Sequence, residues 1–186
     1  MAWTEPNLIK VLKGGGIAVM PTDTLYGIVG KALDPAVVER IYEMRKRAPQ
    51  KPCIILIGNI NELEKFSITL TEEQKNKLKE YWDSSIPSSI ILDCDNDIFT
   101  YLHRGMKSLA IRIPYQKDLQ DLLLKTGPLV APSANIESLP PAGNIEQAKK
   151  YFGSLVDLYI DGGEMNGKAS RVIKLHKDGS TSILRA

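Results

Sequence analysis

The sequence has few cysteines and histidines and little net charge. Its 186 residues include two of each, and 24 Lys and Arg against 22 Asp and Glu give a formal net charge of +2. Cys53 and Cys94 lie in apolar surroundings and cannot provide a disulfide framework, so we expect buried free thiols. So small a net charge does not indicate a protein that binds nucleic acid through bulk charge.

Long apolar runs are also missing. The longest stretches, such as residues 53–57 and 90–92, are far shorter than the roughly 20 residues of a membrane helix. The first ten residues lack the basic start and apolar middle of a signal peptide. No repeat or linker-like tract indicates a domain boundary. We therefore expect one cytoplasmic domain over residues 1–186, with no membrane contact.

Several familiar site signatures are absent too. The sequence contains no Walker A motif, no G-x-G-x-x-G and no zinc-type cysteine and histidine spacing. His103 and His176 are isolated from other candidate groups, so we do not expect either to be catalytic. No metal site made by the protein itself is predicted.

Apolar periodicity predicts helices and strands in mixed order. The predicted helices span residues 6–13, 35–47, 72–81, 119–125 and 144–152. The predicted strands span residues 17–20, 54–57, 90–92, 109–113, 129–131, 156–160, 171–175 and 181–184. Adjacent strands near the end of the chain favour an α/β fold with a twisted mixed sheet and flanking helices over a strictly alternating parallel fold.

Four segments gather polar side chains beside predicted strands or at a helix end. They are residues 21–27 (PTDTLYG), 45–52 (RKRAPQKP), 131–135 (APSAN) and 161–170 (DGGEMNGKAS). Each also fits a plain structural role, such as a capped turn or a solvated helix end whose cations complement the helix dipole. If the second helix continues through Arg47, it places Lys46 and Arg47 about 100° apart, and only one of them faces a groove.

In their order and spacing these segments resemble the YrdC/Sua5 family. PTDTLYGI after a strand, RKRAPQKP after a helix, then SLAIRIP, APSAN with LPPA, and DGG up to Ser170 carry the resemblance from about residue 14 to residue 185. The chain resembles the short, single-domain form. The resemblance implies a YrdC-like sheet around a large, positively lined concave groove.

The resemblance also implies an activity, L-threonylcarbamoyladenylate synthase. In this family the threonine amine captures carbon dioxide, and the carbamate oxygen then displaces pyrophosphate from ATP, for N6-threonylcarbamoyladenosine at tRNA position 37. The implied substrates are ATP with Mg²⁺, L-threonine and bicarbonate. The implied partner is the downstream tRNA threonylcarbamoyl transferase complex, and a weak contact with tRNA is left open.

The resemblance assigns site residues by position. The ATP site would comprise Arg45, Arg47, Lys51, Ser108, Ser133, Asn135, Pro141 and Arg185. The threonine site would comprise Thr24, Arg112, Ala131 through its backbone, and Ser170. A guanidinium fork matches a carboxylate, so we expect Arg112 to hold the threonine carboxylate. No residue is assigned to covalent or acid–base catalysis, and the Mg²⁺ is carried by ATP.

The chain departs from the family pattern at four positions, and two alternatives stay open. The departures are Arg45, where lysine is usual, Ser89, Glu137 and Arg171. One alternative is a non-enzymatic module that binds double-stranded RNA, although modest charge and 6% aromatic residues disfavour an extended RNA surface. The other is related carbamoyl-adenylate chemistry, as in hydrogenase-maturation proteins, whose zinc-finger-like and acylphosphatase-like regions this sequence lacks.

Overall fold

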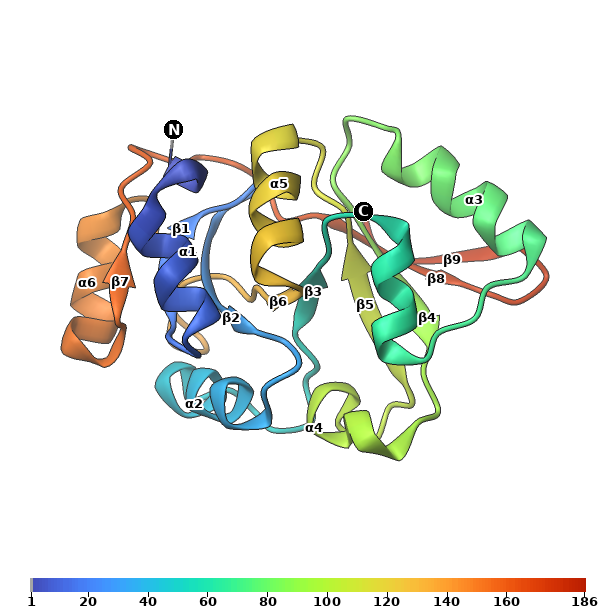
Figure 1. Cartoon of the computed structure of the whole chain (residues 1–186), viewed down its shortest axis with the longest axis horizontal. Helices are drawn as coiled ribbons and strands as arrows, with labels where there is room; N and C mark the ends of the chain where they lie inside the picture. Colours follow the sequence, from blue (N-terminus) through green and yellow to red (C-terminus); the bar gives the residue numbers. More distant parts are fainter. Residues whose placement is uncertain (1) are drawn as a thin grey trace.

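The computed structural model describes residues 2–186, which form a twisted mixed sheet flanked by helices (Figure 1). The strands are β1 Ala18–Pro21, β2 Tyr26–Lys31, β3 Ile54–Leu56, β4 Ser88–Asp93, β5 Ser108–Arg112, β6 Leu129–Val130, β7 Leu158–Tyr159, β8 Arg171–Leu175 and β9 Thr181–Arg185. The α-helices are α1 Pro6–Lys13, α2 Pro35–Arg45, α3 Glu72–Trp82, α4 Thr100–His103, α5 Lys117–Thr126 and α6 Ile145–Phe152. Short 3-10 helices are η1 Ala2–Thr4, η2 Ile60–Phe66, η3 Asp97–Phe99 and η4 Gly153–Leu155.

The spatial order of the strands differs from their order along the chain. It is β7-β1-β2-β6-β3-β5-β4-β8-β9. The pairs β1–β7, β3–β5 and β4–β8 are parallel, and the other neighbouring pairs are antiparallel. The predicted mixed α/β fold is therefore confirmed. This order inserts β6 between β2 and β3, which brings the loop after β6 beside the start of β2, where Ser133 bridges to Gly27.

Apolar side chains cover both faces of the sheet. On β1, Val19 belongs to a core cluster that includes residues of α2, whereas Ala18 and Met20 belong to a second cluster. That second cluster contains Leu8 of α1 and Leu119 of α5, the two helices that lie in front of the sheet in Figure 1. Successive side chains of a strand point to opposite faces, so a strand buried on both faces reads as a continuous apolar run.

Helix α2 begins as its sequence predicts but ends early. The Asp34 carboxylate caps it by accepting the backbone N–H groups of Ala36 and Val37. The helix ends at Arg45, and Lys46 adopts a left-handed conformation with φ 49°. The prediction that this helix runs through Arg47 was wrong, and the helical angle between Lys46 and Arg47 no longer applies. Residues 46–52 instead form a loop.

Strand β2 was not predicted: residues 21–27 were expected to form a loop, and no strand was predicted between that loop and α2. The structure explains Gly30 by close packing: a Cβ there would lie 2.4 Å from Cγ1 of Val37, so α2 packs directly on the strand. The short segments η2 and α4 were also missed. The predicted free thiols are confirmed, since Cys53 and Cys94 are both buried and unpaired. Among residues 2–186, no helix is long and apolar enough to span a membrane.

Candidate active site

A cavity of about 480 Å³ lies beside β3, β5 and β8 and the loops after β1 and β6, a size typical of small-molecule sites. On β5, Ser108, Ala110 and Arg112 line the cavity. Leu109 and Ile111, which alternate with them, are buried in the core. One strand therefore supplies both core side chains and part of the site.

Most of the predicted site residues line this cavity. They are Thr24, Arg47, Ser108, Arg112, Ala131, Ser133, Pro141, Ser170 and Arg185. The fold thus brings together residues from all four polar segments, from β5 and from the end of β9. Arg45, Lys51 and Asn135 do not line it.

The loop of residues 21–27 is a β-hairpin turn shaped by one threonine. The Thr22 hydroxyl donates to the Leu25 carbonyl at 2.7 Å and accepts the backbone N–H of Thr24 at 3.2 Å. Strands β1 and β2 pair on either side, with Pro21 opposite Tyr26. This turn presents Thr24 to the cavity.

Arg112 is buried and already carries a partner that the sequence did not reveal. Its Nη2 lies 2.8 Å from Oδ1 of Asp23 and 3.4 Å from the Thr24 hydroxyl, and Nη1 lies 3.3 Å from the Ser89 hydroxyl. The side chains of Arg112 and Asp23 are 3% and 2% exposed. Burial lowers the pKa of Arg112, while the Asp23 carboxylate opposes that shift. A guanidinium has five N–H groups, so some donors remain for a ligand.

Two serine hydroxyls connect Arg112 with Arg185. The hydroxyls of Ser89 and Ser170 lie 2.8 Å apart, and both residues are buried. Arg185 donates from Nε and Nη2 to the Ser170 carbonyl at 3.0 and 2.8 Å. Arg112 and Ser170, predicted for threonine, therefore share one hydrogen-bonded network with Arg185, predicted for ATP.

Arg45 and Asn135 lie beneath the cavity wall. Arg45 is 2% exposed, and it donates to the Asn135 carbonyl and to Asn135 Oδ1, each at 3.0 Å. Asn135 Oδ1 also accepts the Ser133 hydroxyl at 2.7 Å. Burial lowers the pKa of Arg45 to about 10, which leaves it charged at neutral pH. The geometry supports a role in holding the loop that carries Ser133, and the predicted contact of Arg45 and Asn135 with ATP stays a prediction.

Of the two remaining basic residues, only Arg47 lines the cavity. It donates from Nε to the Lys51 carbonyl and from Nη2 to the Pro52 carbonyl, each at 2.9 Å. Lys51 was predicted to contact ATP, but its ammonium pairs with the Glu137 carboxylate outside the cavity lining. Glu137 stood out in the sequence only as a departure from the family pattern.

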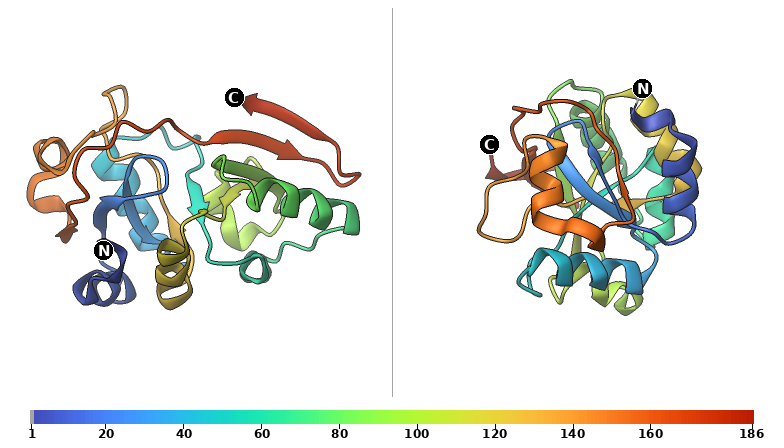
Figure 2. Two further views of the ribbon diagram at one scale, coloured as in Figure 1. Left: turned by 90° about the horizontal axis from the view of Figure 1, so that it is seen from above. Right: turned by 90° about the vertical axis from the view of Figure 1, so that its left-hand side faces the viewer.

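Residues 161–170 form a strap, the extended connection between β7 and β8 (Figure 2), and its last two residues, Ala169 and Ser170, line the cavity. Tyr26 anchors it: the phenol accepts the Gly162 N–H at 2.7 Å and donates to the Gly163 carbonyl at 2.9 Å. Burial raises the pKa of Tyr26, so the phenol keeps its proton. A Cβ on Gly167 would lie only 2.0 Å from the Thr24 carbonyl oxygen. The strap can approach Thr24 this closely because that position is glycine.

The cavity is suited to binding anions. Arg47, Arg112 and Arg185 line it, and no carboxylate, thiol or imidazole does. His103 is buried and accepts the Gly105 N–H through Nδ1, and His176 pairs with a hydroxyl on β9. Within residues 2–186, no group of three His, Cys, Asp or Glu side chains is placed to hold a metal ion. The arrangement favours positioning and charge neutralisation over covalent catalysis.

The family model described as Sua5/YciO/YrdC, telomere recombination, matches residues 10–186. The chain belongs to this family. The family expected from the four polar segments is therefore confirmed.

Individual relatives agree with this membership. A putative threonylcarbamoyl-AMP synthase of Mycobacterium leprae is 28% identical over 97% of this chain and 81% of its own length. The threonylcarbamoyl-AMP synthase of Pyrococcus abyssi is 31% identical over 88% of this chain, which spans only 48% of that protein. The crystal structure of P. abyssi Sua5 complexed with L-threonine is 28% identical, with a TM-score of 0.83 over 100% of this chain and 54% of that one.

Proposed function

We propose that this protein is an L-threonylcarbamoyladenylate synthase, which converts L-threonine, bicarbonate and ATP into threonylcarbamoyl-AMP and pyrophosphate. The observation that carries the proposal is the convergence of Thr24, Arg112 and Ser170 with Arg47, Ser133 and Arg185 on one cavity. Relatives named threonylcarbamoyl-AMP synthases support the same chemistry. They favour it over related carbamoyl-adenylate reactions.

In this mechanism the protein mainly positions and neutralises two anionic substrates. Arg112 lies beside Thr24 and Ser170 and would hold the threonine carboxylate. Arg47 and Arg185 would hold phosphate oxygens of ATP. With both substrates fixed, the carbamate oxygen can reach the α-phosphate, and cations stabilise the charge that the leaving pyrophosphate carries away.

Magnesium enters this proposal with ATP rather than as a resident ion. The residues that line the cavity include no carboxylate, so phosphate oxygens and water would supply the ligands of the Mg²⁺. Such a shared arrangement is usual for Mg²⁺ at nucleotide sites. The protein's own contribution is the set of arginines around the phosphates.

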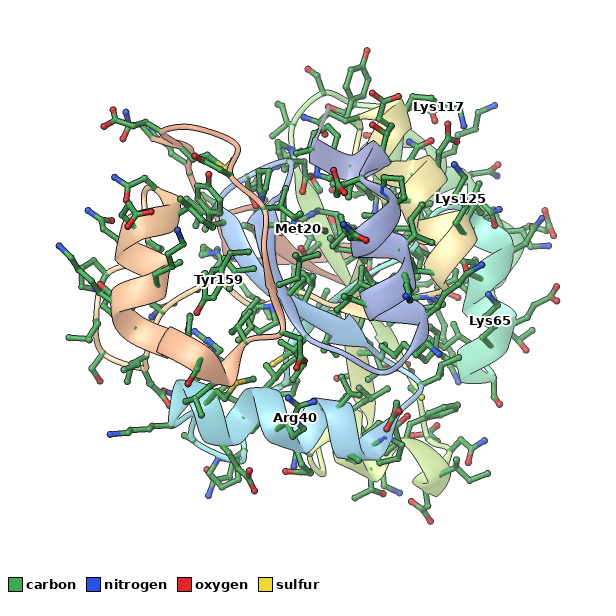
Figure 3. All side chains as sticks on the ribbon, turned by 60° about the vertical axis from the view of Figure 1, so that its left-hand side comes forward. Met20, Arg40, Lys65, Lys117, Lys125 and Tyr159 are labelled. Atoms are coloured by element: carbon green, nitrogen blue, oxygen red, sulfur yellow. The ribbon has the colours of Figure 1, made fainter. Side chains whose placement is uncertain are left out.

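The proposal places the enzyme in the cytoplasm, where a tRNA threonylcarbamoyl transferase complex would consume its product. A non-enzymatic RNA-binding module is not favoured, because its cations should line an exposed surface. Arg47 and Arg112 instead face a cavity. Lys65 on η2 and Lys117 and Lys125 on α5 lie on the outside of the molecule, scattered over two elements (Figure 3). A weak tRNA contact remains part of the proposal.

The test is a substrate-omission assay on the purified chain. With ATP and Mg²⁺ present, pyrophosphate release should require both L-threonine and bicarbonate, and mass spectrometry should detect the acyl-adenylate. L-serine should be poorer, because one methyl group in a fitted pocket is worth about 1 to 3 kcal/mol. Equal pyrophosphate release without threonine would refute the assignment.

A further inference from the structure

Glu137 is an acidic residue placed between the two loops that carry the predicted ATP-binding cations. One of its carboxylate oxygens pairs with the Lys51 ammonium, and the other accepts the backbone N–H of Ala48. Its own N–H donates to the Arg45 carbonyl at 2.7 Å. Glu137 therefore ties the loop of residues 46–52 to the loop that follows β6.

The groups around this carboxylate are those that bind phosphate. An ammonium and a backbone N–H donate to it, and the guanidinium of Arg47, which lines the cavity, is close enough to act on its charge. These cations and the N–H keep the pKa of Glu137 below its usual range, so it is an anion at neutral pH. Lysine, arginine and backbone N–H groups recur in the phosphate sites of nucleotide-binding proteins.

Lys51 and Glu137, the two members of the ion pair, differ in how exposed their side chains are. The Lys51 side chain is 62% exposed, whereas that of Glu137 is 20% exposed. Lys51 directly precedes Pro52, which lines the cavity. Since the lysine stem is flexible and Glu137 is the less exposed partner, the ammonium is the group that can move when the ion pair opens.

We infer that Glu137 is a positioning residue that holds Lys51 away from the cavity until the phosphates of a nucleotide replace its carboxylate. The exchange trades one ion pair for another, so Glu137 lowers the affinity for ATP while it orders the loop of residues 46–52. The inference rests on the proposed function for the identity of the nucleotide.

The first measurement is the affinity of Mg·ATP for the purified chain by calorimetry, without threonine. Glu137→Gln keeps the size of the side chain but removes its charge. It should bind ATP about three- to tenfold more tightly, because Lys51 is released and a negative charge near the triphosphate is lost. In a Lys51→Ala background the same substitution should lose most of this gain, which a double-mutant cycle detects.

Two controls separate this role from bulk charge and from loop folding. Glu80→Gln breaks the surface pair with Lys77, 2.6 Å long, and makes the same change in net charge, so it should leave ATP affinity unchanged. Glu137→Asp retains the charge and should stay near wild type. In steady-state assays Glu137→Gln should lower the KM for ATP without changing the KM for threonine.

The possible results distinguish a failure of the role inferred for Glu137 from a failure of the proposed synthase activity. Weaker ATP binding by Glu137→Gln, equal effects of Glu137→Gln and Glu80→Gln, or an unchanged gain without Lys51 would each overturn the inference. A chain that binds ATP with the expected differences but releases no threonine-dependent pyrophosphate would support the role of Glu137 and refute the proposed synthase. A chain that does not bind ATP would overturn both.

Discussion

Arg47 and Lys46 are neighbours of equal charge in very different positions, and their comparison tests the nucleotide site. Arg47 lies in the loop after α2, lines the cavity and is held by the carbonyls of Lys51 and Pro52. Lys46 ends α2 in a left-handed conformation and is exposed. Arg47→Ala and Lys46→Ala change the net charge equally, so a difference between them must come from position.

The two alanine substitutions should reduce the affinity for ATP by very different factors. A hydrogen bond to a charged group is worth about 1.5 to 3 kcal/mol, and about 1.4 kcal/mol corresponds to tenfold in affinity. Arg47→Ala should therefore weaken ATP binding by about tenfold to a hundredfold. Lys46→Ala should change it by less than about fivefold, because exposed charges contribute at most about 1 kcal/mol. Arg47→Lys keeps the charge but loses the two carbonyl contacts, and an intermediate value is expected.

The assay is ATP affinity and adenylate formation for each variant at two salt concentrations. A direct phosphate contact by Arg47 predicts that the gap between the two alanine variants persists at higher salt. A solvated basic loop predicts small, similar losses that fade together as salt screens them. Equal behaviour of the pair would refute the placement of Arg47 in the nucleotide site.

Two further substitutions test the threonine side. Asp23→Asn leaves the Arg112 charge buried without its carboxylate. It should destabilise the fold by about 3 to 5 kcal/mol in chemical denaturation, whereas a loss below 1 kcal/mol would show that the pair is unimportant. Gly167→Ala places a Cβ 2.0 Å from the Thr24 carbonyl and must displace the strap, so the KM for threonine should rise several-fold while Lys168→Ala on the same strap leaves it unchanged. A normal threonine KM in Gly167→Ala would show that the strap does not shape this site.

The sequence could predict those parts of the fold that depend on local pattern. Helix α1 was predicted with its observed bounds, because its apolar spacing and the glycines after it are both local signals. The end of α2 was wrong, since only a left-handed residue at Lys46 breaks a segment that otherwise favours helix. Strand β2 was missed because Gly30 serves packing against Val37, a contact between two elements.

The candidate site also contains features that local sequence patterns predict and features that depend on contacts between distant segments. Position in short motifs was enough to select Thr24, Arg112 and Ser133, which line the cavity. Motif position could not tell a side chain that lines the cavity from one that does not, so it did not reveal that Arg45, a predicted ATP-site residue, is 2% exposed. Two ion pairs were not predicted because their members lie far apart in the sequence. Asp23 and Arg112 are 89 residues apart, and Lys51 and Glu137 are 86 residues apart.

The serine pair shows why such long-range contacts matter for chemistry. Ser89 lies on β4 and Ser170 directly precedes β8, two parallel neighbours that the sheet order places side by side. Their hydroxyls meet at 2.8 Å, and each also contacts one of the cavity arginines, Arg112 or Arg185. A ligand bound by Arg112 would therefore act on a hydrogen-bond network that also includes Arg185. Because the proposed reaction joins an amino acid to a nucleotide, a network that spans both sides of the cavity would help to fix the two substrates relative to each other.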